Sequence, residues 1–247
     1  MYLTVQGLVV RVSEYNDRDC FLTLLTKEHG RITVKARNVR RKNSAIAACC
    51  QLLTLSEFNL FEYKDSYVVN DAKITELFTG LRTDLNKLSL ATYFAQVIEL
   101  IAQEDFPSSQ LHPLILNCLY ALSYLQESEH KVKAVFELRC ACLAGFTPDL
   151  SECRECGNPW PDLFDASEGC LTCKKCQQPG SSGIRMPISD GILAAMRYIC
   201  QCDPKRLFSF SLSSEGLEAL SNITELFLTC QLERGFSALD FYKSLCI

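Results

Sequence analysis

The chain has 247 residues, of which 48% are hydrophobic and 22% charged, and its net charge is −4. This composition is typical of globular proteins and excludes a largely disordered chain, while the length suffices for one large domain or two smaller ones. Met1 is not followed by a basic and then an apolar stretch, and no apolar run reaches the roughly 18 residues of a membrane helix. We therefore expect a cytoplasmic protein with no signal peptide and no membrane contact.

Residues 1–80 favour β-structure. Ile32 and Val34 alternate with polar neighbours, which is the pattern of a strand with one buried face. The expected strands are 5–12, 20–26, 31–36, 51–63 and 66–74, with a short helix over 44–50 between the third and the fourth. Five strands with a helix at that position predict an OB-fold, a small Greek-key barrel.

From about Leu81 onward, hydrophobic residues recur at helical spacing. Asp84 is the expected N-cap of the first helix. Further helices are expected over 113–126, 131–144, 190–202, 214–230 and 237–246. The sequence thus predicts a multi-domain α+β protein, with an OB-fold domain at residues 1–80 and an α-helical domain at 81–247 that contains a zinc module at about 149–186.

Two Cys-x-x-Cys pairs form the strongest motif in the sequence: Cys153 with Cys156, and Cys173 with Cys176. Each such turn directs two thiolates toward one point, and two turns complete a tetrahedron around Zn²⁺. Four thiolates leave no open coordination position, so we expect a structural zinc ion. Cys170 and Cys173 form an alternative second pair; we favour Cys176 because the residues before Cys173 are typical of a turn and strand that lead into a metal-binding turn.

The chain has 15 cysteines in all. An odd number in a long chain without a secretion signal favours a reducing compartment, where scattered cysteines pack as small apolar residues. For the two Cys-x-x-Cys pairs, redox or packing roles and an iron–sulfur site are the alternatives to zinc.

The charges are unevenly distributed. Between Lys27 and Ser44, seven basic residues stand against one acidic residue, Glu28. Lys and Arg bind phosphates without reading base sequence, and OB barrels hold single strands in a basic groove with stacked aromatic residues. The segment 35–42 therefore predicts a nucleic-acid contact, for which a solvated loop is the alternative. The candidate stacking residues, which would otherwise lie in the core, are Tyr15, Phe21, Tyr63 and Tyr67.

A catalytic site is not expected. No phosphate-binding loop, nucleophile elbow or His-Glu-x-x-His motif is present. The only histidines, expected at the surface rather than as general bases, are His29, His112 and His130. A further cluster, for which a solvated turn is favoured over a Mg²⁺ site, comprises Glu14, Asp17 and Asp19.

Several motifs occur in a specific order. The first are Thr-Lys-Glu-His-Gly-Arg at 26–31, Ala-Arg-Asn-Val-Arg-Arg at 36–41 followed by Ser44, and Leu-Arg-Thr-Asp-Leu at 81–85. The later and most specific ones are Phe-Glu-Leu-Arg at 136–139, Gly-Phe-Thr-Pro-Asp-Leu at 145–150, Cys-x-x-Cys-Gly at 153–157 and the segment 164–176. Together they resemble, over nearly the whole chain, the RecO family of bacterial recombination mediators. Asn38 and Cys170 stand where that family usually has glycines, and Arg37 where it has a lysine.

The resemblance implies binding to single- and double-stranded DNA, annealing of complementary strands, and loading of RecA onto SSB-coated DNA together with RecR. It also implies docking of the acidic C-terminal tail of SSB on the helical domain. Arg139 and Arg197 are candidates for clamping its carboxylates. A protein with these partners is expected in the cytoplasm, associated with the nucleoid.

We therefore expect a non-enzymatic mediator of DNA repair and recombination. Its expected DNA-binding residues are Arg31, Lys35, Arg37, Arg40, Arg41 and Lys42. Its expected zinc ligands are Cys153, Cys156, Cys173 and Cys176. Two alternatives are a zinc-dependent nucleic-acid enzyme, which four cysteine ligands disfavour, and a zinc-containing protein–protein scaffold whose basic loop is incidental.

Overall fold

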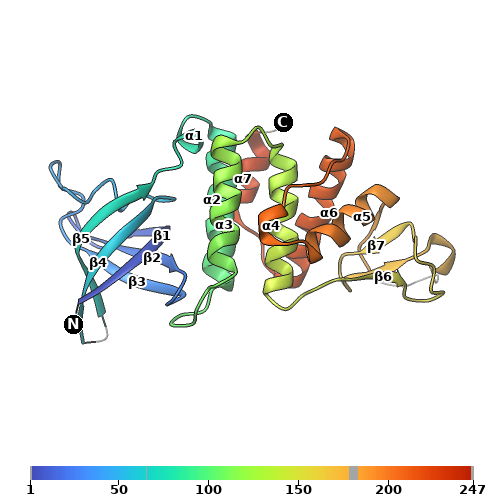
Figure 1. The fold of residues 1–247 in the computed structure, drawn as a ribbon, viewed down its shortest axis with the longest axis horizontal. Helices are drawn as coiled ribbons and strands as arrows, with labels where there is room; N and C mark the ends of the chain where they lie inside the picture. Colours follow the sequence, from blue (N-terminus) through green and yellow to red (C-terminus); the bar gives the residue numbers. More distant parts are fainter. Residues whose placement is uncertain (1, 65, 178–182, 246–247) are drawn as a thin grey trace. The chain divides into compact units, whose positions relative to one another are not determined.

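The computed structural model describes residues 2–64, 66–177 and 183–245, and the chain divides into two compact units (Figure 1). The first unit comprises Met1–Gln126 and Phe236–Ile247, and the second comprises Glu127–Gly235. The first unit holds a β-barrel with helices beside it, and the second holds helices with a small sheet.

The N-terminal strands close into a barrel. They are β1 (Tyr2–Glu14), β2 (Cys20–Thr26), β3 (Arg31–Ala36), β4 (Leu55–Tyr63) and β5 (Ser66–Glu76). The strand order is β1-β2-β3-β5-β4, and β1 also pairs with β4 to close the barrel. β3 and β5 are parallel, whereas the other neighbouring pairs are antiparallel. This arrangement confirms the predicted five-stranded OB-fold.

The alternation of hydrophobic residues explains how the barrel core is filled. Leu22 and Leu24 on β2 pair with Val34 and Ile32 on β3, and all four side chains are buried. Phe58 of β4 is fully buried in the same core. Burial contributes roughly 25 cal/mol per Å² of apolar surface. A register shift by one residue, which would turn these side chains to solvent, is therefore strongly disfavoured.

Strand β1 is longer than the predicted strand 5–12 because it pairs with two strands, β4 and β2. Residues 2–8 pair with β4, and residues 7–14 pair with β2. A bulge between Val9 and Arg11 interrupts the register with β2 and allows the strand to bend. Hydrophobic periodicity reports burial rather than pairing, so it located only the buried part of this strand.

The predicted helix over 44–50 is wrong, because residues 45–50 form turns. The backbone N–H of Ala47 donates to the Ser44 carbonyl at 3.4 Å, and that of Cys50 donates to the Ile46 carbonyl at 3.2 Å. Ile46 and Cys50 pack against the barrel core. Packing on the barrel therefore holds this segment, without a continuous helix.

Helices complete the first unit: α1 (Thr79–Arg82), α2 (Leu85–Ile101), α3 (Leu111–Tyr124) and α7 (Ser237–Leu245). The Asp84 carboxylate accepts hydrogen bonds from the N–H groups of Asn86 and Lys87, which confirms the predicted N-cap. The Tyr93 ring of α2 meets the Phe236 ring edge-on, with 5.4 Å between the centroids. This contact anchors the C-terminal helix in the first unit, although the two residues are distant in sequence.

His112 contradicts the prediction that all histidines lie at the surface. Its residue is only 5% exposed, and among the described residues its Nε2 has no hydrogen-bond partner. Burial lowers the pKa of this imidazole below its usual value of 6.5, because the charged form is poorly solvated there. Lys27 and Glu28 lie close enough to affect the pKa of His112, so a segment distant in sequence faces this side chain, and the residues around His112 in the sequence do not show its burial.

A neutral buried imidazole makes stability depend on pH. As the pH falls below about 6.5, the unfolded chain binds a proton before the folded chain does, so stability decreases. The variant His112→Phe has no imidazole to protonate and is expected to lose this part of the pH dependence of stability. The free energy of unfolding, measured at about pH 8 and about pH 5.5, should change less in the variant than in the wild type. An equal change in both proteins would contradict this account of His112.

The second unit combines helices with a small sheet. The helices are α4 (Glu129–Leu143), α5 (Asp190–Gln201) and α6 (Ser214–Leu232), with short 3-10 helices at Lys174–Cys176 and Pro204–Arg206. The sheet contains, in spatial order, β6 (Asp149–Cys153), β8 (Cys170–Thr172), β7 (Leu163–Asp165) and β9 (Arg185–Pro187). The sequence predicted α4, α5, α6 and the strand before Cys173, but not the two short 3-10 helices. The other strands are too short to show a hydrophobic period.

A buried ion cluster joins α4 to α6. The Lys133 Nζ lies 3.0 Å from Glu137 Oε1 and 2.9 Å from Glu225 Oε2, and it donates to the Ser221 carbonyl. The Thr224 hydroxyl donates to Glu137 at 2.7 Å. Each buried charge therefore has partners that offset its desolvation, and the cluster fixes the register of the two helices.

The change from strands to helices falls between Glu76 and Thr79, beside the predicted boundary at residue 80. The compact units divide the chain elsewhere, after Gln126 and before Phe236. The predicted domain boundaries stay predictions.

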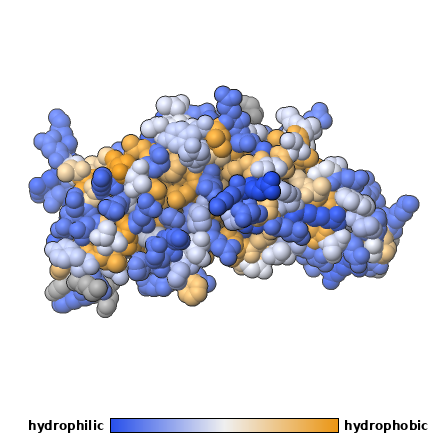
Figure 2. Space-filling model, in the orientation of Figure 1, coloured by the Kyte–Doolittle hydropathy of each residue, from blue (hydrophilic) through white to orange (hydrophobic). Residues whose placement is uncertain are grey.

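No helix within residues 2–64, 66–177 and 183–245 is long and apolar enough to cross a bilayer. Figure 2 shows hydrophilic residues interleaved with hydrophobic patches on the displayed face.

Candidate metal centre and nucleic-acid interface

Four cysteine side chains meet beside the small sheet of the second unit. Cys153 ends β6, and Cys156 follows in a turn that Gly157 closes by donating its N–H to the Cys153 carbonyl at 2.9 Å. Gly157 has a φ of 69°, a conformation that favours glycine. Cys173 follows β8, and Cys176 donates its N–H to the Cys173 carbonyl at 2.9 Å. Two tight turns thus bring their thiols to one place.

The spacing of the four sulfur atoms fits a tetrahedral metal ion. All four lie within 4.8 Å of one another, and the sulfur atoms of Cys156 and Cys173 are 3.8 Å apart. Zn–S bonds of about 2.3 Å in a tetrahedron place neighbouring sulfur atoms about 3.8 Å apart. Within the described residues, no other group of three or more His, Cys, Asp or Glu side chains is arranged closely enough to hold a metal ion. The four cysteines can therefore hold one.

Hydrogen bonds to sulfur favour the thiolate form that binds metals. Burial raises the pKa of Cys153, but the backbone N–H groups of Cys156, Glu155 and Cys173 donate to its sulfur and hold the pKa at about 6. The Cys173 N–H lies 3.3 Å from that sulfur. The Asn158 amide in turn donates to the Cys173 sulfur at 3.3 Å. These donors orient two of the four thiols for a cation.

Cys170 lies outside this cluster. It belongs to β8, it is 8% exposed, and its sulfur hydrogen-bonds with the Arg154 side chain. Burial raises the pKa of its thiol. Cys170 is thus a packed thiol of the sheet, and the geometry selects Cys176 as the partner of Cys173.

The basic segment leaves the barrel after β3 and folds over the β1–β2 turn. Asn38 has a φ of 54°, and its N–H donates to the Asp19 carboxylate at 2.8 Å. The Arg40 N–H donates to the Arg18 carbonyl at 3.1 Å, and Val39 between them is buried. Asparagine tolerates this left-handed conformation better than most residues. The turn therefore forms without glycine.

Three of the predicted DNA-binding residues are paired with acidic side chains. The pairs are Arg31 with Glu104 at 3.0 Å, Lys35 with Asp19 at 3.5 Å, and Arg40 with Glu14 at 3.0 Å. Two members of the acidic cluster, Glu14 and Asp19, are thus ion-pair partners of the basic segment. Sequence reasoning missed these pairs because the partners are distant in the sequence.

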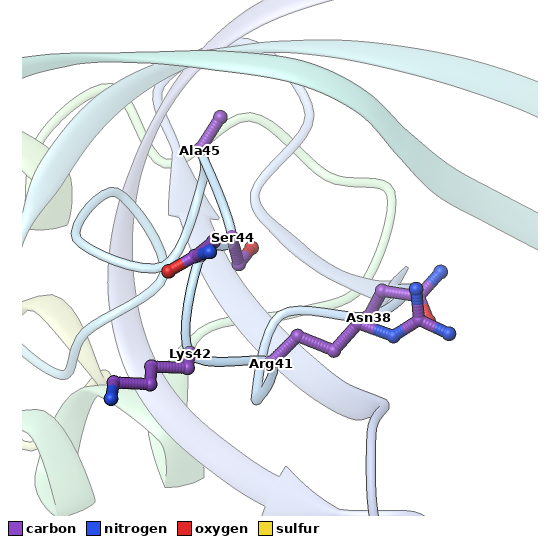
Figure 3. A pocket seen from close by; sticks show the side chains of 6 residues that line it. Asn38, Arg41, Lys42, Ser44 and Ala45 are labelled. Atoms are coloured by element: carbon purple, nitrogen blue, oxygen red, sulfur yellow. The ribbon is translucent and has the colours of Figure 1, made fainter.

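The other three predicted residues form what we call the cationic turn: Arg37, Arg41 and Lys42. All three are exposed, and none is in an ion pair with a described carboxylate. Arg41 and Lys42 extend in opposite directions beside a surface hollow of about 560 Å³ (Figure 3). Arg37 borders a neighbouring hollow together with Arg18, which sequence reasoning missed because it stands among acidic residues.

Tyr15 is the most exposed of the candidate stacking residues whose side chains the structure describes. It is 58% exposed, whereas Phe21 and Tyr67 are half-buried, and the Tyr63 side chain lies outside the described residues. The Lys35 Nζ lies 4.2 Å from the Tyr15 ring centroid, and the Phe21 ring meets it edge-on at 5.1 Å. The exposed Tyr15 ring is therefore held in place by contacts with Lys35 and Phe21.

Arg139 and Arg197 are engaged within the second unit. Arg139 donates to the carbonyl of Cys200 at 3.0 Å. Arg197 donates to the carbonyls of Leu150 and Ser151 at 2.7 Å each, and its guanidinium lies 5.0 Å from the Trp160 ring centroid. Arg139 thus holds the end of α5, and Arg197 braces the chain beside the metal module, so each guanidinium is partly engaged.

A closed OB barrel with an exposed cationic turn, joined to helices and a four-cysteine metal module, is a combination typical of proteins that handle nucleic acid. The family model for the N-terminal part of recombination protein O matches residues 1–78, and the model for its C-terminal part matches residues 82–240. The chain therefore belongs to the RecO family of DNA repair proteins, which confirms the resemblance found in the sequence.

Curated relatives match the chain over nearly its whole length. The DNA repair protein RecO of Acetivibrio thermocellus is 33% identical over 246 residues, covering 99% of this chain and 97% of the relative. The RecO of Alkaliphilus metalliredigens is 28% identical, covering 99% and 100%. The RecO of Heliobacterium modesticaldum is 31% identical, covering 97% and 89%.

Proposed function

We propose that this chain is a non-enzymatic recombination mediator that binds DNA, anneals complementary single strands and, with RecR, helps to load RecA onto SSB-coated single-stranded DNA. Membership of the RecO family supports the role in DNA repair. The observation that supports a direct DNA contact is the exposed cationic turn on the barrel. Annealing requires only that two strands be neutralised and held close together, so the proposal needs no catalytic residue.

We place the DNA phosphates first on Arg37, Arg41 and Lys42. Cations without an acidic partner should contribute most to DNA binding, because they displace counterions from the DNA without first breaking an ion pair. Arg40 is 40% exposed, and an exposed ion pair such as its contact with Glu14 is worth about 0–1 kcal/mol. Arg40 can therefore exchange its carboxylate for a phosphate. Lys35 and Arg31 are less exposed and serve as supporting charges.

We propose that the four-cysteine cluster holds a structural Zn²⁺. Support comes from the donor set, because four sulfur atoms at tetrahedral spacing suit zinc and leave no position for a reacting water. The ligands Cys153, Cys156, Cys173 and Cys176 join the ends of β6 and β8. Zinc would thus stabilise the small sheet and the loops that follow it.

Tyr15 is expected to stack on an unpaired base. The substitution Tyr15→Ala should weaken binding to single-stranded DNA by about tenfold, because base–aromatic stacking contributes about 1–3 kcal/mol. Tyr15→Phe keeps the ring and should retain the wild-type affinity. Duplex DNA offers no free base face, so its affinity should be nearly unchanged in both variants. Fluorescence anisotropy with matched single- and double-stranded oligonucleotides measures these effects, and an equal loss for both substrates would argue against stacking.

The proposed partners are single- and double-stranded DNA, RecR and the acidic C-terminal tail of SSB, in the cytoplasm at the nucleoid. Family membership supports these partners. Arg139 and Arg197 stay our candidates for clamping the carboxylates of that tail, although their carbonyl contacts already use some of the N–H donors of each guanidinium.

A salt titration of binding to single-stranded DNA, with metal content and strand annealing measured on the same sample, tests the proposal. We expect binding that weakens linearly on a log–log scale, one zinc per chain, and annealing without nucleotide hydrolysis. A protein that fails to bind at about 50 mM salt would instead be a protein–protein scaffold. Cleavage of the DNA on addition of Mg²⁺ would indicate an enzyme.

A further inference from the structure

A pair of thiols outside the metal cluster joins two helices of the second unit. Cys142 lies near the end of α4 and Cys200 near the end of α5, and their sulfur atoms are 3.7 Å apart. Both residues are half-buried. A disulfide bond is about 2.0 Å long, so a rotation of the two side chains that brings the sulfur atoms about 1.7 Å closer would allow the bond to form.

The pair can be reached from the surface. Cys200 borders a cavity of about 350 Å³ whose wall also includes Thr147 and Gln201. The Thr147 side chain hydrogen-bonds with Cys142, so the same cavity wall contacts both thiols. A small molecule that enters this cavity meets Cys200, and the Cys142 sulfur lies 3.7 Å from the Cys200 sulfur.

The two thiols differ in their electrostatic surroundings. The hydrogen bond between the two thiols lowers the pKa of Cys142 to about 7; burial opposes this effect, whereas the Thr147 hydrogen bond and the Arg139 charge add to it. The same hydrogen bond, together with burial, raises the pKa of Cys200. Cys142 is therefore the thiol that loses its proton first and attacks an electrophile.

We propose that Cys142 and Cys200 form a thiol–disulfide exchange site for small disulfides such as oxidised glutathione. The Cys142 thiolate attacks one sulfur of the small disulfide, forms a mixed disulfide and releases one small thiolate. Cys200 then loses its proton to solvent and attacks the Cys142 sulfur, forming the Cys142–Cys200 bond and releasing the second thiolate. The protein dithiol is oxidised by two electrons, and one small disulfide is reduced to two small thiols.

This cross-link would close a loop over residues 143–199, which contains the four-cysteine cluster. A closed loop restricts the open states of the chain between its ends. Oxidation of the pair should therefore slow the loss of metal from the module to a chelator, about threefold or more. The proposal concerns the second unit alone and does not depend on the DNA contact of the barrel.

The test uses the full-length, metal-loaded, reduced protein, exposed to oxidised glutathione and then mapped as alkylated peptides by mass spectrometry. The wild type should lose two thiols, gain a peptide that links Cys142 to Cys200, and retain no glutathione. Cys200→Ser should instead keep one glutathione on Cys142. In Cys142→Ser, Cys200 should acquire glutathione at least tenfold more slowly than Cys142 does in Cys200→Ser, because burial still raises the pKa of the Cys200 thiol.

Cys202→Ser is the matched control. Cys202 is also half-buried, burial raises its pKa, and its thiol donates to the Ile199 carbonyl of α5. The control should form the Cys142–Cys200 bond at the wild-type rate. The proposal is overturned if both thiols stay free while others are oxidised, if Cys200 links to Cys202, or if Cys142→Ser acquires glutathione on Cys200 as fast as Cys200→Ser acquires it on Cys142. Metal retention in each variant verifies that the unit remains folded.

Discussion

The double variant Arg41→Glu with Lys42→Glu is expected to bind single-stranded DNA at least tenfold more weakly than the wild type at low salt. Two cations without described ion-pair partners are replaced by two anions at the edge of one surface hollow. Each lost phosphate contact forfeits counterion release, and each new carboxylate repels the backbone. Fluorescence anisotropy with a labelled oligonucleotide measures the loss.

Lys205→Glu with Arg206→Glu provides the matched control. These two residues are adjacent, exposed and basic, and they lie in a short 3-10 helix of the second unit. The control changes the net charge by the same amount, so it separates a local contact from a general charge effect. An equal loss of affinity in both double variants would contradict the assignment of the DNA contact to the cationic turn.

Cys156→Ser is expected to abolish stoichiometric metal binding and to destabilise the second unit. A structural zinc site contributes directly to folding, because the ligands of an unfolded chain are not assembled. We expect a loss of about 3 kcal/mol or more, which corresponds to a fall of roughly 6–12 °C in Tm for a chain of this size. Elemental analysis and thermal unfolding measure the two effects. A chelator that removes the metal should also lower the Tm of the wild type.

The control for the metal site is Cys170→Ser. Cys170 lies outside the cluster and bonds with Arg154, so this variant should keep one metal ion per chain. If Cys170→Ser lost the metal while Cys156→Ser kept it, the ligand set inferred from the geometry would be wrong.

Local patterns predicted most of the elements. The bounds of β2 and β3 were predicted to the residue, because each strand has one buried face and ends at a turn. Asp84 also acts as the predicted N-cap. These features depend on residues a few positions apart, and such neighbours are visible in a sequence.

Features that depend on distant residues were not predicted. Burial of His112 arises from the packing of α3, and the turns at 45–50 arise from packing on the barrel. The ion pair between Arg40 and Glu14 joins the basic segment to the end of β1. The sequence placed the candidate DNA contact in the basic segment, which stays a prediction, and the structure was needed to show which of its cations are exposed and without described acidic partners.

The most direct test of the DNA contact is the salt dependence of binding to single-stranded DNA in Arg41→Glu with Lys42→Glu. Each phosphate contact contributes about 0.7 to the slope of log K against log salt concentration. If the cationic turn holds phosphates, the slope of the folded double variant should fall by about 1.4 relative to the wild type. A slope equal to that of the wild type would mean that DNA binds elsewhere on the molecule.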